Sequence, residues 1–276
     1  MATNTSKLPV TVVLPVKNDR IALGQCLKRL GQFSEIVVVD SGSSDGTSEI
    51  AEEYGAKLLQ FNWDGKFPKK RNWYLLNMTP SQPWVLFLDA DELISDEVCH
   101  AISLALEDES FDGFWLHYTN YFMGEPLLHG LPQRKLALFR AGKGLYERIE
   151  EDNWTSLDME VHEHPIIEGK IGEIRTPIDH QDFRGISQLL KRHHAYAEWE
   201  ARRYIKLRKN SALSLQFTTR QRLKYTFLRS WWFPFAYFIF VYFFRFGFLD
   251  GKRGFFYAAF KSNYFFTIGL LLREFD

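Results

Sequence analysis

Two aspartates follow directly after a strand-like apolar run, with a spacing that suits a divalent cation. The run Trp84-Val-Leu-Phe-Leu88 ends in Asp89, Ala90, Asp91 and Glu92. An apolar run of this length is typical of a strand buried on both faces, and such a strand delivers its last residues to the carboxyl edge of a sheet. Two carboxylates separated by one small residue can face a hard cation whose other ligands are diphosphate oxygens and water. The alternative is an acidic turn that caps the following helix.

Two further polar groups precede this run. Asp40 ends the β-branched run 35–40, and the Ser- and Gly-rich loop 41–47 follows it. A strand-end carboxylate beside such a loop can accept hydrogen bonds from a base or a ribose while backbone N–H groups line the pocket. Asp45 and Thr47 are equally suited to capping the next helix. The basic group 70–72 is suited to a diphosphate, but it would also be ordinary on a solvated helix face.

The elements that must position these groups alternate regularly. The patterns predict strands at 10–16, 35–40, 55–61 and 84–88, and helices at 21–30, 48–54, 66–77 and 95–106. Such an order favours a mostly parallel α/β sheet with helices on both faces. The runs 113–118 and 134–139 are separated by Gly and Pro turns, so they are predicted as added antiparallel strands.

These groups, in this order, resemble the family 2 nucleotide-sugar glycosyltransferases of GT-A (Rossmann-like) fold. The matching pieces are 14–18, 38–47, 70–72 and 88–92. The resemblance implies that the first loop and the Asp40 position contact uracil and ribose, that Arg71-Asn72 lies near the nucleotide, and that the Asp-x-Asp motif binds Mg²⁺ or Mn²⁺ bridging the donor diphosphate. The nucleotide-sugar residues implied are Pro15, Val16, Asn18, Asp40, Ser41, Gly42, Ser43, Lys70, Arg71, Asn72, Asp89, Ala90 and Asp91.

The second half of the chain narrows the resemblance. The pieces 122–124, 129–130, 134–140, 161–163 and 248–252 look like the branch that contains the lipopolysaccharide-core β-glucosyltransferases. That branch often has Arg-Leu-Phe-Arg where this chain has Leu136-Ala-Leu-Phe-Arg140. Arg134 and Arg140 are accordingly predicted to contact the acceptor or support its site.

An inverting transfer needs a carboxylate that takes the proton of the acceptor hydroxyl. Glu163 is the predicted base, with Glu160 as the alternative. His162 or His180 would orient the base, and His180 would complete a metal shell with Asp89 and Asp91. Zinc is a weaker alternative, because the His-Glu-His spacing lacks the HExxH pattern.

The last third differs in charge and in aromatic content. Residues 1–180 carry 17 Lys and Arg against 28 Asp and Glu, whereas residues 181–276 carry 17 against 6. We therefore predict a catalytic domain over 1–180 and a basic, aromatic helical region over 181–276, which meets an anionic membrane through residues 186–276. The helix at 186–209 is amphipathic.

The uncharged run at 230–244 has 15 residues and contains Pro234. A membrane span needs about 20 residues, so residues 230–248 are predicted to lie in the interface, where Trp and Tyr are favoured. A buried core or an oligomer contact is the alternative. No nucleic-acid module is present, so no nucleic-acid partner is expected.

Cellular placement follows from two observations. Cys26 and Cys99 give no disulfide framework, and the first residues contain no apolar signal region. We therefore expect a cytoplasmic protein, peripheral on the inner face of the cell membrane.

The predicted activity is metal-dependent, inverting transfer of a hexose, with glucose the first candidate, from a UDP-sugar to a glycolipid or lipopolysaccharide-core acceptor. One alternative is a phosphatase of the haloacid-dehalogenase type, which needs its nucleophilic Asp on an early strand. Another is a non-catalytic, membrane-docked UDP-sugar-binding scaffold. A sugar-nucleotide pyrophosphorylase would need a Gly-rich, Arg-containing loop after the first strand, which 15–18 lacks.

Overall fold

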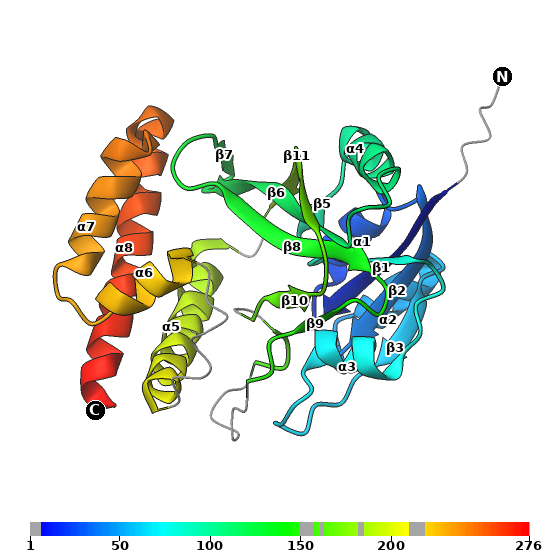
Figure 1. The fold of residues 1–276 in the computed structure, drawn as a ribbon, viewed down its shortest axis with the longest axis horizontal. Helices are drawn as coiled ribbons and strands as arrows, with labels where there is room; N and C mark the ends of the chain where they lie inside the picture. The colour runs from blue at the N-terminus through cyan, green and yellow to red at the C-terminus, as the bar shows by residue number, and fades with distance from the viewer. Residues whose placement is uncertain (1–6, 150–156, 161–162, 182–184, 210–218, 276) are drawn as a thin grey trace. The chain divides into compact units, whose positions relative to one another are not determined.

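The computed structural model describes residues 7–149, 157–160, 163–181, 185–209 and 219–275. The chain forms two compact units (Figure 1). The first contains residues 1–120 and 133–183, and the second contains residues 121–132 and 184–276. The segment 121–132, which the sequence analysis places with the catalytic domain, therefore belongs to the second unit.

One mixed sheet organises the first unit. Its order is β3-β2-β1-β4-β8-β6-β11-β5. The strands are β1 (Leu8–Val16), β2 (Phe33–Asp40), β3 (Lys57–Gln60), β4 (Trp84–Phe87), β5 (Glu92–Leu93), β6 (Gly113–Phe122), β8 (Gln133–Arg140) and β11 (Ile171–His180). The helices are α1 (Arg20–Leu27), α2 (Thr47–Glu53), α3 (Lys70–Asn77) and α4 (Asp96–Leu106).

The predicted α/β architecture is confirmed in its essential pairings. β1 runs parallel to both β2 and β4, with Val16 opposite Asp40 and Val13 opposite Phe87. The carboxyl ends of these three strands therefore meet at one edge of the sheet. β8 is antiparallel to β4 and to β6, as predicted for the added strands. The parallel pairing of β11 with β6 was not predicted.

The sheet is buried on both faces because its central strands are apolar at successive positions. Val12 and Leu14 of β1 point into one core cluster, with side chains of α1 and α4. Val13 points into the other cluster, with Tyr74 of α3. This alternation follows from the two-residue period of a strand. A short sheet of β9 (Gly144–Tyr146) and β10 (Pro165–Ile167) completes the unit.

The second unit is helical apart from β7 and the end of β6. It contains β7 (Glu125–Leu127), α5 (Gly185–Lys209), α6 (Thr219–Phe227), α7 (Phe233–Ile239), the π-helical turn η2 (Phe240–Phe244), the 3₁₀ turn η3 (Gly247–Asp250) and α8 (Gly251–Glu274). Its core includes Ala197, Ala201 and Ile268, where α5 packs on α8. Pro234 lies in the first turn of α7, where its missing N–H is tolerated, so it begins a helix instead of breaking one.

Within the described residues, one helical stretch, Gly247–Glu274, is long and apolar enough to cross a membrane, with a mean hydropathy of 1.2. Length and composition alone are weak evidence, because core helices pass the same test. The segment predicted to lie in the membrane interface is 230–248. The longer apolar stretch, Gly247–Glu274, therefore follows that segment almost entirely.

Gly254 of α8 makes a close backbone contact that a larger residue cannot share. A Cβ at this position would lie 1.8 Å from the Gly247 carbonyl oxygen of η3. We expect Gly254→Ala to lower the free energy of unfolding by about 1–3 kcal/mol, measured by urea denaturation. The control is Gly24→Ala in α1, whose nearest neighbour would be 3.7 Å away. That change should be neutral or stabilising, because Ala is the better helix former. Equal stabilities of the two variants would contradict this packing.

Candidate active site

The turn after β4 places Asp89 between two cations. Its Oδ1 accepts a 2.6 Å hydrogen bond from Arg71 Nη2, and its Oδ2 accepts a 2.7 Å bond from Lys135 Nζ. Burial alone would raise the pKa of Asp89, but Lys135 and Arg71 outweigh it and hold that pKa well below its usual range. Asp89 is therefore an ionised anchor with both oxygens occupied by basic side chains.

Glu92 extends this network into the core. The side chain is fully buried, and one of its oxygens bonds Lys135 Nζ. The other oxygen accepts from the Asp89 backbone N–H at 3.2 Å and from the Tyr118 hydroxyl at 3.3 Å. Burial raises the pKa of Glu92, and repulsion from Asp89 adds to it despite Lys135. Lys135 thus joins two carboxylates that would otherwise repel each other.

Asp91 faces a different partner. His180 Nε2 lies 3.5 Å from Asp91 Oδ1. His180 is the last residue of β11 and pairs with Glu92 of β5, which places it next to Asp91. The amide oxygen of Asn120 lies 3.3 Å from His180 Nδ1 and so orients the ring. Asp91 and His180, both predicted as metal ligands, are thus brought together.

The residues fit a cation that shares its shell with a substrate. No group of three or more His, Cys, Asp or Glu side chains that could hold a metal occurs in the part of the chain that the structure describes. An all-protein cage such as a structural zinc site is thus not found there. Asp91 with His180 matches instead a hard ion bound by one carboxylate, with other positions left to phosphate oxygens and water. Asp89, predicted as a metal ligand, is instead bound to Arg71 and Lys135.

The ends of β1 and β2 form the predicted nucleotide edge. Asp40 is fully buried and accepts hydrogen bonds from Ser43 N at 3.0 Å and from Ser48 Oγ at 3.0 Å. Asn18 Oδ1 accepts from Ser44 N at 2.9 Å, which ties the first loop to the second. These bonds fix the loop around the strand ends.

The same edge leaves one polar group unmatched. The Ser41 hydroxyl is buried without a hydrogen-bond partner among the described atoms. An unpaired buried hydroxyl is costly unless a ligand completes it. Gly42 follows with φ +68°, a left-handed conformation that suits glycine. Pro15 and Val16 end β1, and Val16 O accepts a 2.8 Å bond from Lys70 Nζ. Ser41 is thus the group at this edge best placed to receive a nucleotide.

The start of α3 connects the donor edge to the predicted base. Glu160 is buried and accepts from the backbone N–H of Arg71 at 2.9 Å and of Asn72 at 3.0 Å. It therefore caps the helix from a distant segment, which argues against Glu160 as the base. Glu163 is also buried and pairs with Lys69 Nζ at 3.1 Å.

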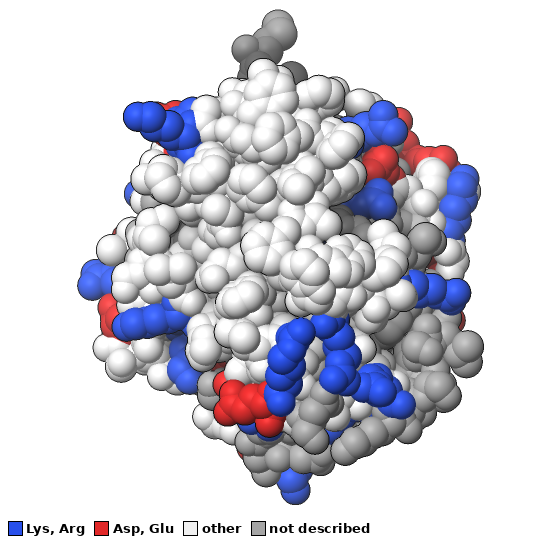
Figure 2. Space-filling view, turned by 90° about the vertical axis from the view of Figure 1, so that its left-hand side faces the viewer, with Lys and Arg blue, Asp and Glu red and all other residues white. Residues whose placement is uncertain are grey.

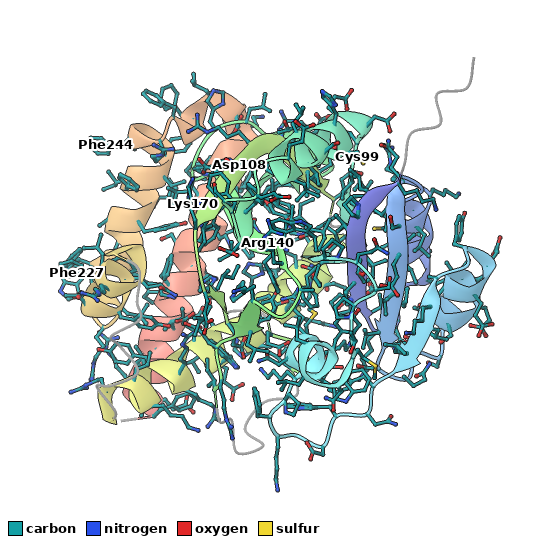
Figure 3. The ribbon with its side chains drawn as sticks, turned by 45° about the vertical axis from the view of Figure 1, so that its right-hand side comes forward. Cys99, Asp108, Arg140, Lys170, Phe227 and Phe244 are labelled. Atoms are coloured by element: carbon teal, nitrogen blue, oxygen red, sulfur yellow. The ribbon has the colours of Figure 1, made fainter. Side chains whose placement is uncertain are left out.

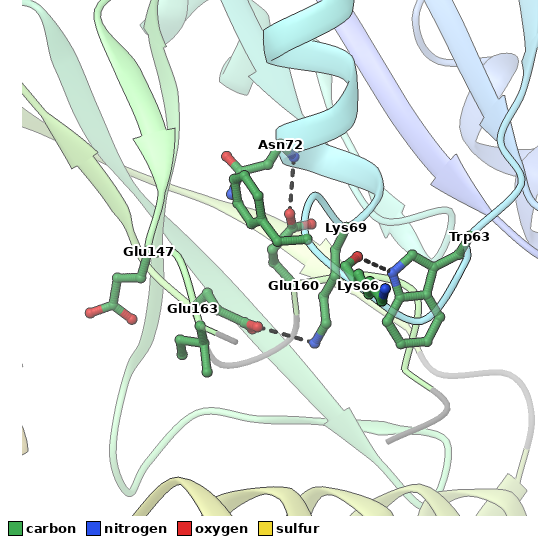
Figure 4. Close-up of a pocket in the computed structure, with 9 residues that line it drawn as sticks. Trp63, Lys66, Lys69, Asn72, Glu147, Glu160 and Glu163 are labelled. Carbon is green, nitrogen blue, oxygen red and sulfur yellow. Dashed lines mark hydrogen bonds and ion pairs between the residues drawn. The ribbon is translucent and has the colours of Figure 1, made fainter. Parts of the chain in front are cut away.

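A small pocket opens beside Glu163 (Figure 4). Two aromatic side chains and several charged ones line it. The lining residues are Trp63, Lys66, Phe67, Lys69, Asn72, Glu147, Ile149, Glu160 and Glu163. With a volume of about 10 Å³ this pocket has room for about one water molecule, so it marks the aromatic and charged lining beside Glu163 and is not a sugar-sized cavity.

Two predicted acceptor or support residues, Arg134 and Arg140, are not brought to this edge. Arg134 points to the opposite face from its neighbour Lys135, where it contacts Glu173 at 3.0 Å. Arg140 lies opposite Trp84, at the far end of β4 (Figure 3). Its guanidinium donates to the carbonyls of Glu109 and Phe111, which secures the loop after α4. His162 lies outside the described residues.

Comparison with known proteins gives the class of this chain. The sequence profile of glycosyl transferase family 2 matches residues 11–161. The chain belongs to this family and is a glycosyltransferase. Because the chain belongs to this family, the phosphatase and pyrophosphorylase alternatives are set aside. The position of Asp89 after the fourth strand also argues against the phosphatase, which needs its nucleophilic Asp on an early strand.

Individual relatives support the assignment. The chain is 31% identical over 179 residues to the lipopolysaccharide core biosynthesis glycosyltransferase LpsC of Rhizobium meliloti, a match that covers 62% of each chain. It is 26% identical to an uncharacterized glycosyltransferase of Rickettsia felis, over 85% of this chain and 80% of the relative.

A solved structure confirms the fold. The mannosyltransferase PcManGT of Pyrobaculum calidifontis, in complex with GDP-Man and Mn²⁺, aligns with 97% of this chain and 87% of its own, with a TM-score of 0.53 and 15% identity. The match supports the predicted GT-A fold.

Lys135 offers a direct test of the carboxylate network. We expect Lys135→Met to lower the free energy of unfolding by about 2–3 kcal/mol, because Glu92 and Asp89 lose their shared cation. Adding Glu92→Gln should recover part of the loss, since the repulsion disappears. Arg134→Met is the control, with an expected cost below about 1 kcal/mol for an exposed pair. Urea denaturation of these variants and of Glu92→Gln alone gives the four values needed, and a double variant as unstable as the sum of its two single changes would contradict the network.

Proposed function

We propose that this glycosyltransferase transfers a hexose, with glucose the first candidate, from a UDP-sugar to a lipopolysaccharide-core or related glycolipid acceptor, with inversion. The observation that carries the proposal is the pairing of Asp91 with His180 at the edge where β1 and β2 present Asp40 and Ser41. The relationship to LpsC supports the acceptor class.

The donor would lie along the carboxyl edge of the sheet. The loops after β1 and β2 would hold the nucleoside, with Asp40 fixing the loop and the Ser41 hydroxyl gaining a partner. Arg71 and Lys135 carry positive charge at Asp89, next to the diphosphate position. This arrangement would stabilise negative charge on the leaving group.

Asp91 and His180 would hold Mg²⁺ or Mn²⁺. When bound, such an ion neutralises charge that develops on the departing diphosphate. The neutral ring of His180 is the form that can ligate, and Asn120 keeps it oriented.

Glu163 would act on the acceptor side. The acceptor oxygen forms a bond to the anomeric carbon, the bond from that carbon to the diphosphate breaks, and the acceptor proton passes to Glu163. Lys69, the residue before α3, holds this carboxylate at 3.1 Å, and Arg71, two residues later in α3, holds Asp89. The first turn of α3 would thus place the base in a fixed position relative to the donor.

The proposed location is the cytoplasmic face of a membrane. A glycolipid acceptor has its sugars at a membrane surface, and the basic second unit is suited to an anionic one. The proposed reaction does not depend on whether the chain forms oligomers.

The metal site is tested with Asp91→Ala. We expect release of UDP from a panel of UDP-sugars to fall about 100-fold or more and to lose its response to Mg²⁺ and Mn²⁺. Asp108→Asn, an exposed acid at the far edge of the sheet, is the control. Unchanged metal-dependent turnover in Asp91→Ala would show that the proposed metal site is wrong.

The base is tested with Glu163→Gln. We expect kcat for transfer to drop about 10²- to 10⁴-fold while binding of the UDP-sugar, measured by calorimetry, changes little. The exposed Glu168 belongs to the same segment, so Glu168→Gln should keep its activity. A Glu163→Gln enzyme that loses donor binding in parallel with kcat would assign this residue a structural role instead.

A further inference from the structure

The second unit exposes an unusually large aromatic surface. We call the outward side of α7, η2, η3 and α8 the aromatic face. Figure 2 shows a broad uncharged surface with Lys and Arg at its margins. Exposed side chains on this face include Trp231, Phe235, Phe243, Phe244, Phe246 and Phe266, each at least 45% accessible. Contiguous apolar patches of this kind mark binding surfaces.

The face contains an open groove between α7 and α8, of about 570 Å³. Pro234, Phe235 and Ile239 line it from α7, and Ala259, Asn263 and Phe266 line it from α8. The two helices are held together on the inside, because Ser262 Oγ donates to the Pro234 carbonyl at 2.7 Å and Phe265 packs on Tyr237 with ring centroids 4.6 Å apart. The groove is therefore a feature of the packed unit.

We propose that the aromatic face binds in the plane of an anionic phospholipid bilayer and that the α7–α8 groove receives a lipid acyl chain. This inference deepens the proposed membrane location by naming the surface and its ligand.

Charge indicates a lipid surface as the partner. From 229 to 273 the sequence has six Lys and Arg but a single acid, Asp250. That acid is turned inward, where it accepts hydrogen bonds from the backbone N–H of His129 at 2.9 Å and of Leu128 at 3.2 Å. The surroundings of the aromatic face are therefore net basic, although Lys261 lies against His193 and Arg253 is paired with Glu125 at 3.1 Å. Cations beside apolar rings are the combination that anionic headgroups and the acyl boundary recognise.

The packing of α8 indicates that this helix lies in the plane of the bilayer and does not cross it. Its inner side contacts the highly charged α5, with Lys261 Nζ 3.3 Å from His193 Nε2 and Arg202 over the Phe275 ring at 4.7 Å. A crossing α8 would carry these charges into hydrocarbon, which is strongly unfavourable. Only 17% of the most apolar 18-residue stretch of this helix is buried, so one side of the helix remains available for lipid.

The test measures binding of the full-length protein to phosphatidylcholine vesicles with and without phosphatidylglycerol, with no donor or acceptor present. We expect sedimentation with the phosphatidylglycerol vesicles, weakened by salt. The double variant Phe235→Glu/Phe266→Glu should bind about tenfold more weakly or worse, because it places charge in the groove. Leu104→Glu, at an exposed apolar site of α4 in the first unit, is the matched control and should bind as the wild type.

Two further measurements fix the ligand. A phosphatidylglycerol with a photoreactive acyl chain should label peptides of α7 and α8, and circular dichroism should show that the double variant is folded. Undiminished vesicle binding by the folded double variant, or labelling confined to other segments, would overturn the inference. A wild-type dimer that the double variant breaks, without any change in vesicle binding, would assign the face to a second copy of the chain instead.

These readouts are independent of sugar transfer. Loss of the proposed activity would leave the lipid binding intact, and failure of the lipid binding would leave the metal and base assignments intact.

Discussion

The candidate site depends on a balance of charge at the end of β4. Asp89 and Glu92 lie close together in a region from which water is largely excluded, and two carboxylates in such a place repel each other strongly. Lys135 from β8 and Arg71 from α3 make the arrangement stable. Since these cations come from different elements, the balance also fixes the added strand and the third helix against the parallel sheet. Asp91 lies beside a different partner, His180.

This balance explains how a short acidic motif can serve two purposes. The first aspartate is bound by basic side chains, and the second lies beside His180, where we propose that a cation binds. A site with a single protein carboxylate for the cation binds weakly until the diphosphate supplies more oxygens. Cation and donor are then expected to bind cooperatively, because each completes the other's contacts.

Local sequence signals correctly predicted the strands whose ends carry the proposed donor edge. The apolar run at 84–88 and the carboxylates that follow it are neighbours in sequence, so strand pattern and site residue are read together. The same holds for Asp40 and its Ser- and Gly-rich loop. The family profile and the GT-A fold agree with this part of the prediction.

The sequence could not reveal the groups that support this edge. Lys135 meets Glu92 across 43 positions, and Glu160 meets Asn72 across 88, so neither pairing leaves a local pattern. Arg140 illustrates the opposite error, since motif similarity pointed to it. Because β8 runs antiparallel to β4, its last residue lies at the far end of the strand whose carboxyl end carries the site.

The remote cap on α3 has a consequence for how the protein folds. The first turn of this helix has its N–H groups satisfied only when Glu160, nearly ninety residues later, is in place. Closing so long a loop is entropically unfavourable and slow compared with local helix formation. We therefore expect the catalytic centre to be assembled late, after the parallel sheet has formed. A nascent chain that has emerged only through β5 would carry the acidic motif 89–92 before the active site could form.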